Sequence, residues 1–97
     1  MLILKTLAHA KPMHGFAIAD YILETSSGVL QVEEGSLYPA LQRMLLKDWI
    51  SGEWGKTEEN RRARYYSLTA LGRKQLAEEE KNWARLTAAV AQILQFA

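Results

Sequence analysis

Positive charge is concentrated in residues 61–74, which hold five basic side chains and no acidic one. The preceding residues, 33–60, carry six acids against three bases, so the formal net charge of +1 hides a local excess. Contact with a phosphate backbone requires such a basic segment, although many basic runs on small domains are only solvated surface. Which of the two interpretations applies depends on the secondary-structure elements that carry these side chains. The basic residues are Arg61, Arg62, Arg64, Arg73 and Lys74.

No arrangement suited to catalysis or metal binding accompanies this charge. His9 and His14 have no third ligand at helical or hairpin spacing, so no metal site is expected. Ser36 has no neighbouring base that would activate it as a nucleophile, and the chain has no cysteine. We therefore expect no enzymatic activity and no cofactor, and we interpret His14 as a helix cap.

The composition suits a small single domain. Ninety-seven residues with 48% hydrophobic content can fill one modest core, which dimerisation would help to stabilise. The apolar run at residues 2–4 is broken by Lys5, so it is too short for a signal peptide or a membrane span. We expect a cytoplasmic protein without a membrane partner, and the absence of cysteine fits a reducing compartment.

Three helices are predicted ahead of the basic segment. The first covers residues 2–10 and ends at a Lys-Pro step, and the second covers residues 14–25 and ends at a Ser-Ser-Gly cluster. Residues 29–32 predict a brief extended segment. The polar and acidic residues 33–36 favour a helix N-terminus, and the third helix follows them and runs to about residue 47. Pro39 is expected in its first turn, where the missing N–H costs nothing.

The third helix is predicted to have one buried face and one outward face. Its apolar residues recur at i, i+4, i+7 and i+8, which forms a single stripe of Leu37, Leu41, Met44 and Leu45. The opposite positions are free to contact a partner. They are Tyr38, Gln42, Arg43 and Lys47.

A β-hairpin follows the third helix. Residues 49–54 and 63–69 alternate as strands do, and the polar loop 55–60 joins them. We expect Arg64 and Tyr65 to be exposed near the end of this hairpin. We expect Trp49 and Trp54 to anchor it to the body, with a direct ligand or DNA role as the alternative. The expected inward positions are Ile50, Trp54, Tyr66 and Leu68.

The last helix begins after Thr69, a good N-cap, and runs to the C-terminus without proline. Its apolar residues follow steps of three, four and seven, which is typical of a helix that packs on another helix. An intramolecular core helix is one interpretation, and a dimer seam is the one we favour, with Leu2 and Leu7 of the first helix packing across the interface. The seam residues are Trp83, Leu86, Val90, Ile93 and Ala97.

This order of elements predicts a mainly α fold with a small β-hairpin, the winged helix-turn-helix (α-α-β-α-β-β), followed by a long C-terminal dimerisation helix. The winged-helix domain would cover residues 1–69 and the dimerisation helix residues 70–97. In this fold the third helix can enter a major groove while the hairpin, or wing, lies along the backbone. The basic run at residues 61–64 falls on the wing, so the local positive charge and the predicted fold indicate the same DNA-binding element.

Four segments together resemble the PadR family of transcriptional regulators. They are MHGF at 13–16, GSLYPALQRM at 35–44, WISGEW at 49–54 and RRARYYSLTALGRKQL at 61–76. The resemblance covers nearly the whole chain. It implies a dimeric bacterial repressor whose third helix reads operator DNA, whose wing holds phosphates and whose last helix builds the dimer.

The resemblance and the outward positions together define the expected DNA-binding residues. On the third helix they are Ser36, Leu37, Tyr38, Pro39, Gln42 and Arg43, and on the wing they are Arg61, Arg62, Arg64 and Tyr65. Two departures from the family pattern are Asp48, where a glycine usually ends the third helix, and the start of the chain almost directly on the first helix. Glu33 and Glu34 would lie close to DNA, so they either face away or lower the affinity.

The expected function is sequence-specific binding of double-stranded DNA as a homodimer on a twofold operator. A winged helix used only for protein interaction is the first alternative, and it would have no basic wing. The second alternative is a sensor of a planar aromatic small molecule bound at the dimer interface beside Trp83, with DNA release as its output. This second alternative can coexist with DNA binding.

Overall fold

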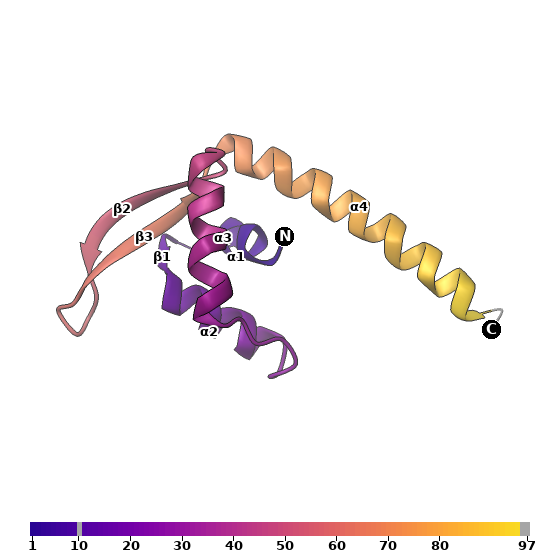
Figure 1. Ribbon diagram of the computed structural model, residues 1–97, viewed down its shortest axis with the longest axis horizontal. Coiled ribbons are helices and arrows are strands. Elements are labelled where there is room, and N and C mark those ends of the chain that lie inside the picture. Colours follow the sequence, from indigo (N-terminus) through magenta and orange to yellow (C-terminus); the bar gives the residue numbers. More distant parts are fainter. Residues whose placement is uncertain (10, 96–97) are drawn as a thin grey trace.

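The computed structural model describes residues 1–9 and 11–95 and has the winged-helix architecture expected from the sequence. Three helices cluster at the base of a small three-stranded antiparallel sheet with the strand order β1-β3-β2, and a fourth, α4, extends away from it (Figure 1). The elements are α1 (Leu2–His9), β1 (Met13–His14), α2 (Gly15–Thr25), α3 (Glu34–Leu46), β2 (Ile50–Lys56), β3 (Arg62–Leu68) and α4 (Ala70–Gln95).

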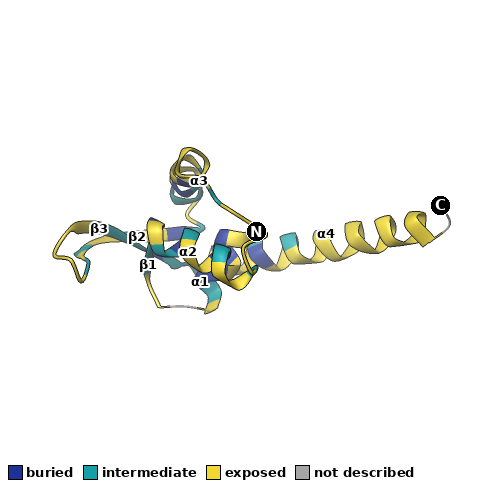
Figure 2. Ribbon diagram, turned by 90° about the horizontal axis from the view of Figure 1, so that it is seen from below, coloured by how far each residue is buried: buried dark blue, intermediate teal, exposed yellow. Residues whose placement is uncertain are grey.

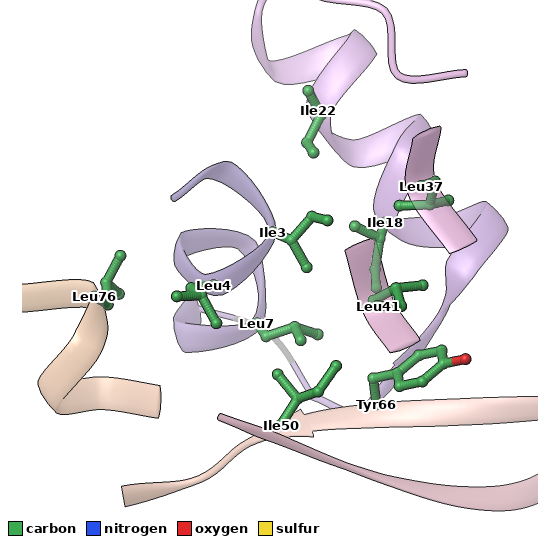
Figure 3. Close-up of a cluster of buried hydrophobic side chains, with 10 residues drawn as sticks. All are labelled: Ile3, Leu4, Leu7, Ile18, Ile22, Leu37, Leu41, Ile50, Tyr66 and Leu76. Atoms are coloured by element: carbon green, nitrogen blue, oxygen red, sulfur yellow. The ribbon is translucent and has the colours of Figure 1, made fainter. Parts of the chain in front are cut away.

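The core lies where α1, α2 and α3 meet the base of the sheet (Figure 3). The stripe expected on α3 supplies two fully buried side chains, Leu37 and Leu41, while Met44 and Leu45 are partly buried beside them. Burial of such apolar side chains is the main force that holds helices of this length against a sheet. The core consists of Ile3, Leu4, Leu7, Ile18, Ile22, Leu37, Leu41, Ile50, Tyr66 and Leu76.

The short strand lies earlier in the chain than the sequence predicted. Residues 29–32 form no strand; their Val29 is largely exposed, and the N–H of Leu30 bonds to the Ser26 hydroxyl at 2.9 Å. The third strand of the sheet is β1, which pairs Met13 with Tyr66 of β3. The serine therefore closes a local turn that holds residues 29–32 away from the sheet edge.

Pro39 lies inside α3, in its second turn, and the prediction of a first-turn position was wrong. Helix α3 begins at Glu34, and the carbonyl of Glu33 accepts the N–H of Ser36 at 3.0 Å and that of Leu37 at 2.9 Å. Pro39 has no N–H to donate to the carbonyl of Gly35 four residues earlier. Gly35 has open space around its α-carbon, so this first part of the helix is not crowded by neighbouring elements.

Asp48 ends α3 at the position where the resemblance led us to expect a glycine. Its φ of 59° is in the left-handed region. The N–H of Trp49 donates to the carbonyl of Met44 at 3.0 Å, and the N–H of Asp48 donates to that of Leu45 at 3.1 Å. These two bonds make a Schellman motif, so α3 ends normally but with a residue that favours this conformation less than glycine does.

The hairpin of β2 and β3 extends well beyond the body, and this explains one wrong prediction. Ile50 and Tyr66 at its base are buried as expected, and Leu68 is partly buried. Trp54 shares their face of the sheet but is 60% exposed, so it does not anchor the wing to the body. The alternation of side chains along β2 correctly predicted the face on which Trp54 lies, but the body of the domain does not extend far enough to cover it.

Helix α4 begins on the body and then leaves it (Figures 1 and 2). Thr69 caps it as expected, because its hydroxyl oxygen accepts the N–H of Gly72 at 3.0 Å and donates to the carbonyl of Asp48 at 2.6 Å. Leu76 is the last residue of α4 in the core, and residues 80–95 are all exposed. The molecule is consequently elongated, with extents of 55 × 29 × 22 Å.

Candidate nucleic-acid interface

The outward face of α3 carries most of the residues expected to contact DNA. Ser36, Tyr38, Pro39, Gln42 and Arg43 are all exposed. Leu37 is the exception, since only 1% of it is exposed and it packs in the core. Its assignment as a DNA-contacting side chain is therefore wrong, and it supports the helix from behind.

Tyr38 is held at the edge of this face by the start of α2. Its ring lies against Gly15, where a β-carbon would come within 2.8 Å of Tyr38 Cε1. His14 precedes Gly15 and caps α2 as expected, because its Nδ1 accepts the N–H of Ala17 at 3.2 Å. The glycine and the cap together place the first turn of α2 close enough to α3 to support a half-exposed tyrosine ring.

The wing presents two arginines and a tryptophan on the face that continues from the core. Arg64 pairs directly with Trp54 across the two strands, and Arg62 lies one alternation further out on the same face. The guanidinium carbon of Arg62 is 4.3 Å from the centroid of the Trp54 ring, and that of Arg64 is 5.9 Å from it. Both distances are within the range of a cation–π interaction.

Gly52 provides the space for Arg64. A β-carbon at this position would lie 2.5 Å from Arg64 Nε, so the arginine side chain crosses directly over the backbone of β2. Arg64 Nε is buried and has no hydrogen-bond partner among the described residues. The arginine is thus held by packing against Gly52 and Trp54, and not by a hydrogen bond from this atom.

The tip of the wing has a different charge from its strands. Arg61 is highly exposed, and its Nε is 3.9 Å from a carboxylate oxygen of Glu59, with Glu58 next to it. An ion pair between exposed side chains contributes little stability, but the two acids offset the charge of the arginine. The positive charge of Arg62 and Arg64 on the inner face is therefore less offset by an ion pair than that of Arg61 at the tip.

Tyr65 lies on the opposite face of the wing from Arg62 and Arg64. It pairs with Glu53 and His14, its hydroxyl donates to the carbonyl of Lys56 at 3.1 Å, and its ring meets the His14 ring edge-on at 5.5 Å. The structure therefore does not bring Tyr65 together with the other wing residues expected to contact DNA.

An open cleft of about 1180 Å³ separates α3 from the wing. Tyr38 and Gln42 line one side, and Trp54, Arg62 and Arg64 line the other. The acidic residues Asp20, Glu58 and Glu59 also reach its lining. The cleft therefore joins two of the outward α3 residues to the cationic face of the wing.

Tyr66 closes the inner end of this cleft. Burial raises the pKa of its hydroxyl above the ordinary value, the charge of Arg64 partly opposes this shift, and Tyr38 adds to it. The hydroxyl, which is neutral at physiological pH in any tyrosine, consequently stays neutral to a higher pH than usual. It can donate a hydrogen bond but adds no negative charge near an incoming phosphate.

Helix α4 carries an exposed apolar seam, as its spacing predicted. Trp83, Leu86, Val90 and Ile93 are all exposed, and Leu94, which the sequence reasoning missed, lies next to them. Leu2 of α1 is also exposed, whereas Leu7 is buried in the core of its own chain and is not available to a partner. Ala97 lies outside the described residues.

Neither metal-binding nor membrane-spanning features were found in the parts of the chain that the structure describes. Within residues 1–9 and 11–95, no three histidine, aspartate or glutamate side chains gather as a metal site would require. None of the described helices combines the length and the apolar character needed to cross a bilayer.

Comparison with solved structures relates this architecture to transcriptional regulators. A transcriptional regulator from Clostridium thermocellum superposes with a TM-score of 0.85 at 22% identity, covering 94% of this chain and 87% of that one. A PadR-like transcriptional regulator from Bacillus cereus gives a TM-score of 0.78 at 27% identity, over 96% and 87% of the two chains. Bacillus subtilis PadR in complex with operator DNA gives 0.69 at 21% identity, over 79% of this chain and 43% of that one.

The sequence comparison agrees with these structures. Residues 3–78 match the model of the transcriptional regulator PadR-like family, which covers α1 to α3, the whole wing and the start of α4. The members of this family are transcriptional regulators and not enzymes, as the lack of catalytic residues led us to expect. Because the family model matches most of the sequence and the fold agrees with that of PadR-like structures, this chain belongs to the PadR-like family of transcriptional regulators.

Proposed function

We propose that this regulator is a repressor that binds a twofold operator as a homodimer in the cytoplasm. The single observation that carries the proposal is the cleft between α3 and the wing, with outward polar residues on one side and two arginines on the other. In a winged helix, the third helix enters the major groove and the wing follows the backbone. The similar Bacillus subtilis PadR is described in complex with operator DNA, which supports DNA binding by a protein of this fold.

In this proposal α3 supplies sequence discrimination. Gln42 and Arg43 are its exposed polar residues, and their side chains can form paired hydrogen bonds with the edges of adenine and guanine. Ser36, Tyr38 and Pro39 lie nearer the start of the helix and contact the backbone or the groove wall. Arg62 and Arg64, with a smaller contribution from Arg61, bind phosphates.

The homodimer is proposed from the free end of α4. Residues 81–95 are all exposed in the single chain, and an isolated helix of this length is marginal in water. A second copy packed along the seam would cover its apolar residues and set two α3 helices about 34 Å apart, one turn of DNA. Residues 70–97 would then act as the dimerisation helix and residues 1–69 as the DNA-binding domain.

An electrophoretic shift with the DNA upstream of the gene for this regulator tests the proposal. The wild-type chain should bind that DNA more tightly than a random duplex of equal length. Arg43→Ala should weaken binding to the preferred site by roughly 1–3 kcal/mol and to random DNA by less. Equal losses on both duplexes would show that α3 does not read the sequence.

A second function is favoured by the position of Trp83. Its indole is exposed on the seam, so in the proposed dimer it would face the gap between the two subunits. An aromatic wall at an interface suits a planar aromatic ligand, and binding there could release DNA by shifting the subunits. Quenching of Trp83 fluorescence by such a ligand, together with a loss of DNA binding, would support this role.

A further inference from the structure

Trp54 is a large aromatic side chain left in water beside two arginines, and the proposed function gives it no role. Exposing an indole to this extent on a protruding hairpin contributes nothing to the core. Its position is set by strand register, because Trp54 pairs with Arg64 and lies diagonally across from Arg62. The three side chains therefore meet on the inner face of the wing, which lines the cleft opposite α3.

The contacts leave both arginines able to bind an anion. A guanidinium group that stacks on an aromatic ring uses its face, so its N–H groups still point outward along its edge. Among the described residues neither Arg62 nor Arg64 takes part in an ion pair, whereas Arg61 is close to Glu59. Arg62 and Arg64 thus keep their charge available, while their long side chains are already restricted by Trp54 and Gly52.

We propose that Trp54 is a positioning residue that holds Arg62 and Arg64 as a clamp for the phosphates of one DNA strand in the cleft. The proposal rests on the proposed function and specifies how the wing carries it out. The DNA backbone enters along the inner face of the wing, next to Arg62 and Arg64, and not along the tip, where Glu58 and Glu59 would repel a phosphate. Restricting the two arginines before binding reduces the entropy lost when they contact DNA.

The test is a double-mutant cycle on DNA binding, measured by fluorescence anisotropy with a labelled duplex over a range of salt concentrations. Trp54→Ala should weaken binding to specific and random duplexes alike by about two- to five-fold, the equivalent of one exposed cation–π interaction. Trp54→Phe should retain most of the affinity, because phenylalanine also offers a ring face. Arg62→Gln combined with Arg64→Gln should lower the salt slope by about 0.9 for each lost phosphate contact.

The decisive variant combines all three substitutions. If Trp54 acts only by positioning the arginines, adding Trp54→Ala to the Arg62→Gln and Arg64→Gln variant should cause no further loss. A further loss equal to that of Trp54→Ala alone would overturn the proposal, because the indole would then act on DNA independently. Wild-type affinity in Trp54→Ala would also overturn it.

Two controls make these outcomes specific. Lys47→Gln removes another cation that stacks on a tryptophan, with Lys47 Nζ 4.6 Å from the Trp49 ring, but it lies outside the cleft. It should not show coupling to Trp54. Thermal unfolding of Trp54→Ala should match the wild type, because the side chain is exposed. Failure of the wild-type chain to bind any DNA would refute the proposed function itself, whereas normal binding by Trp54→Ala would refute only the clamp.

Discussion

Aspartate at both Val90 and Ile93 should convert the proposed dimer into a folded monomer. The two side chains are 45% and 70% exposed in the single chain, so the substitutions remove little from its own core. In a dimer that packs α4 against a partner, each aspartate would place a charge in an apolar seam without an opposite charge nearby. The two substitutions should therefore weaken dimer association and leave the winged-helix domain folded.

The size of the effect follows from these exposures. Complete burial of a valine or isoleucine side chain stabilises a protein by about 1.5–3 kcal/mol. Roughly half of each side chain is exposed in the single chain, so its burial in the dimer would contribute about 1–2 kcal/mol to association. Two positions in each of two subunits give about 4–8 kcal/mol. This corresponds to a loss of roughly a thousand-fold to a million-fold in dimer affinity, before the cost of burying aspartate.

Sedimentation velocity measures the mass directly, and circular dichroism checks that the helices remain. A matched control places aspartate at Gln92 and Gln95, which have the same spacing on the opposite side of α4 and should leave the dimer unchanged. A dimer of unchanged mass in the Val90 and Ile93 variant would refute the reasoning. Unfolding of that variant would also count against it, because the structure puts both side chains outside the core.

Three further outcomes are expected. Neutralising Arg62 and Arg64 together should weaken binding to every duplex and lower the salt slope by about 0.9 per lost phosphate contact; an unchanged slope would show that the wing is not on the backbone. Gly15→Ala should leave the melting temperature nearly unchanged but weaken operator binding, because its β-carbon would displace the hydroxyl-bearing end of the Tyr38 ring. A crystal structure or a binding curve that matches the wild type would contradict this. Asp48→Gly should stabilise the chain by about 0.5–1 kcal/mol, since glycine adopts the left-handed conformation more readily, and a lower melting temperature than the wild type would argue against it.

The sequence was sufficient for the helices and for the outward face of α3. Apolar spacing predicted α2 and α3 to within a residue or two, and it placed Leu37 in the buried stripe. The resemblance to relatives placed the same residue among the DNA contacts, and the structure shows that the helical spacing was the better guide. His14 and Thr69 were recognised as caps because a cap depends on neighbours within three residues.

The errors concern features that depend on distant parts of the chain. A two-residue strand such as β1 exists only because the edge of β3 is there to pair with it, and no local pattern indicates this. Alternation along β2 gives the face on which Trp54 lies but not the point at which the body stops covering that face. The proximity of Trp54 to Arg62 and Arg64 could have been inferred from the hairpin register, had the loop length been used to align the strands.

In the proposed dimer, the joint between the body and α4 would set the relative placement of the two DNA-binding domains. A β-carbon at Gly72 would meet the carbonyl oxygen of Trp49, so the first turn of α4 is seated on the backbone that leads into the wing. Helix α4 has 26 residues and is about 39 Å long, so a tilt of only about 10° at this joint moves its far end by about 7 Å. In the proposed dimer, α4 would therefore act as a lever arm with its pivot at Gly72. Substitutions around the pivot could retune the distance between two operator half-sites, so regulators of this type could diverge in target spacing while every base-reading residue stays the same.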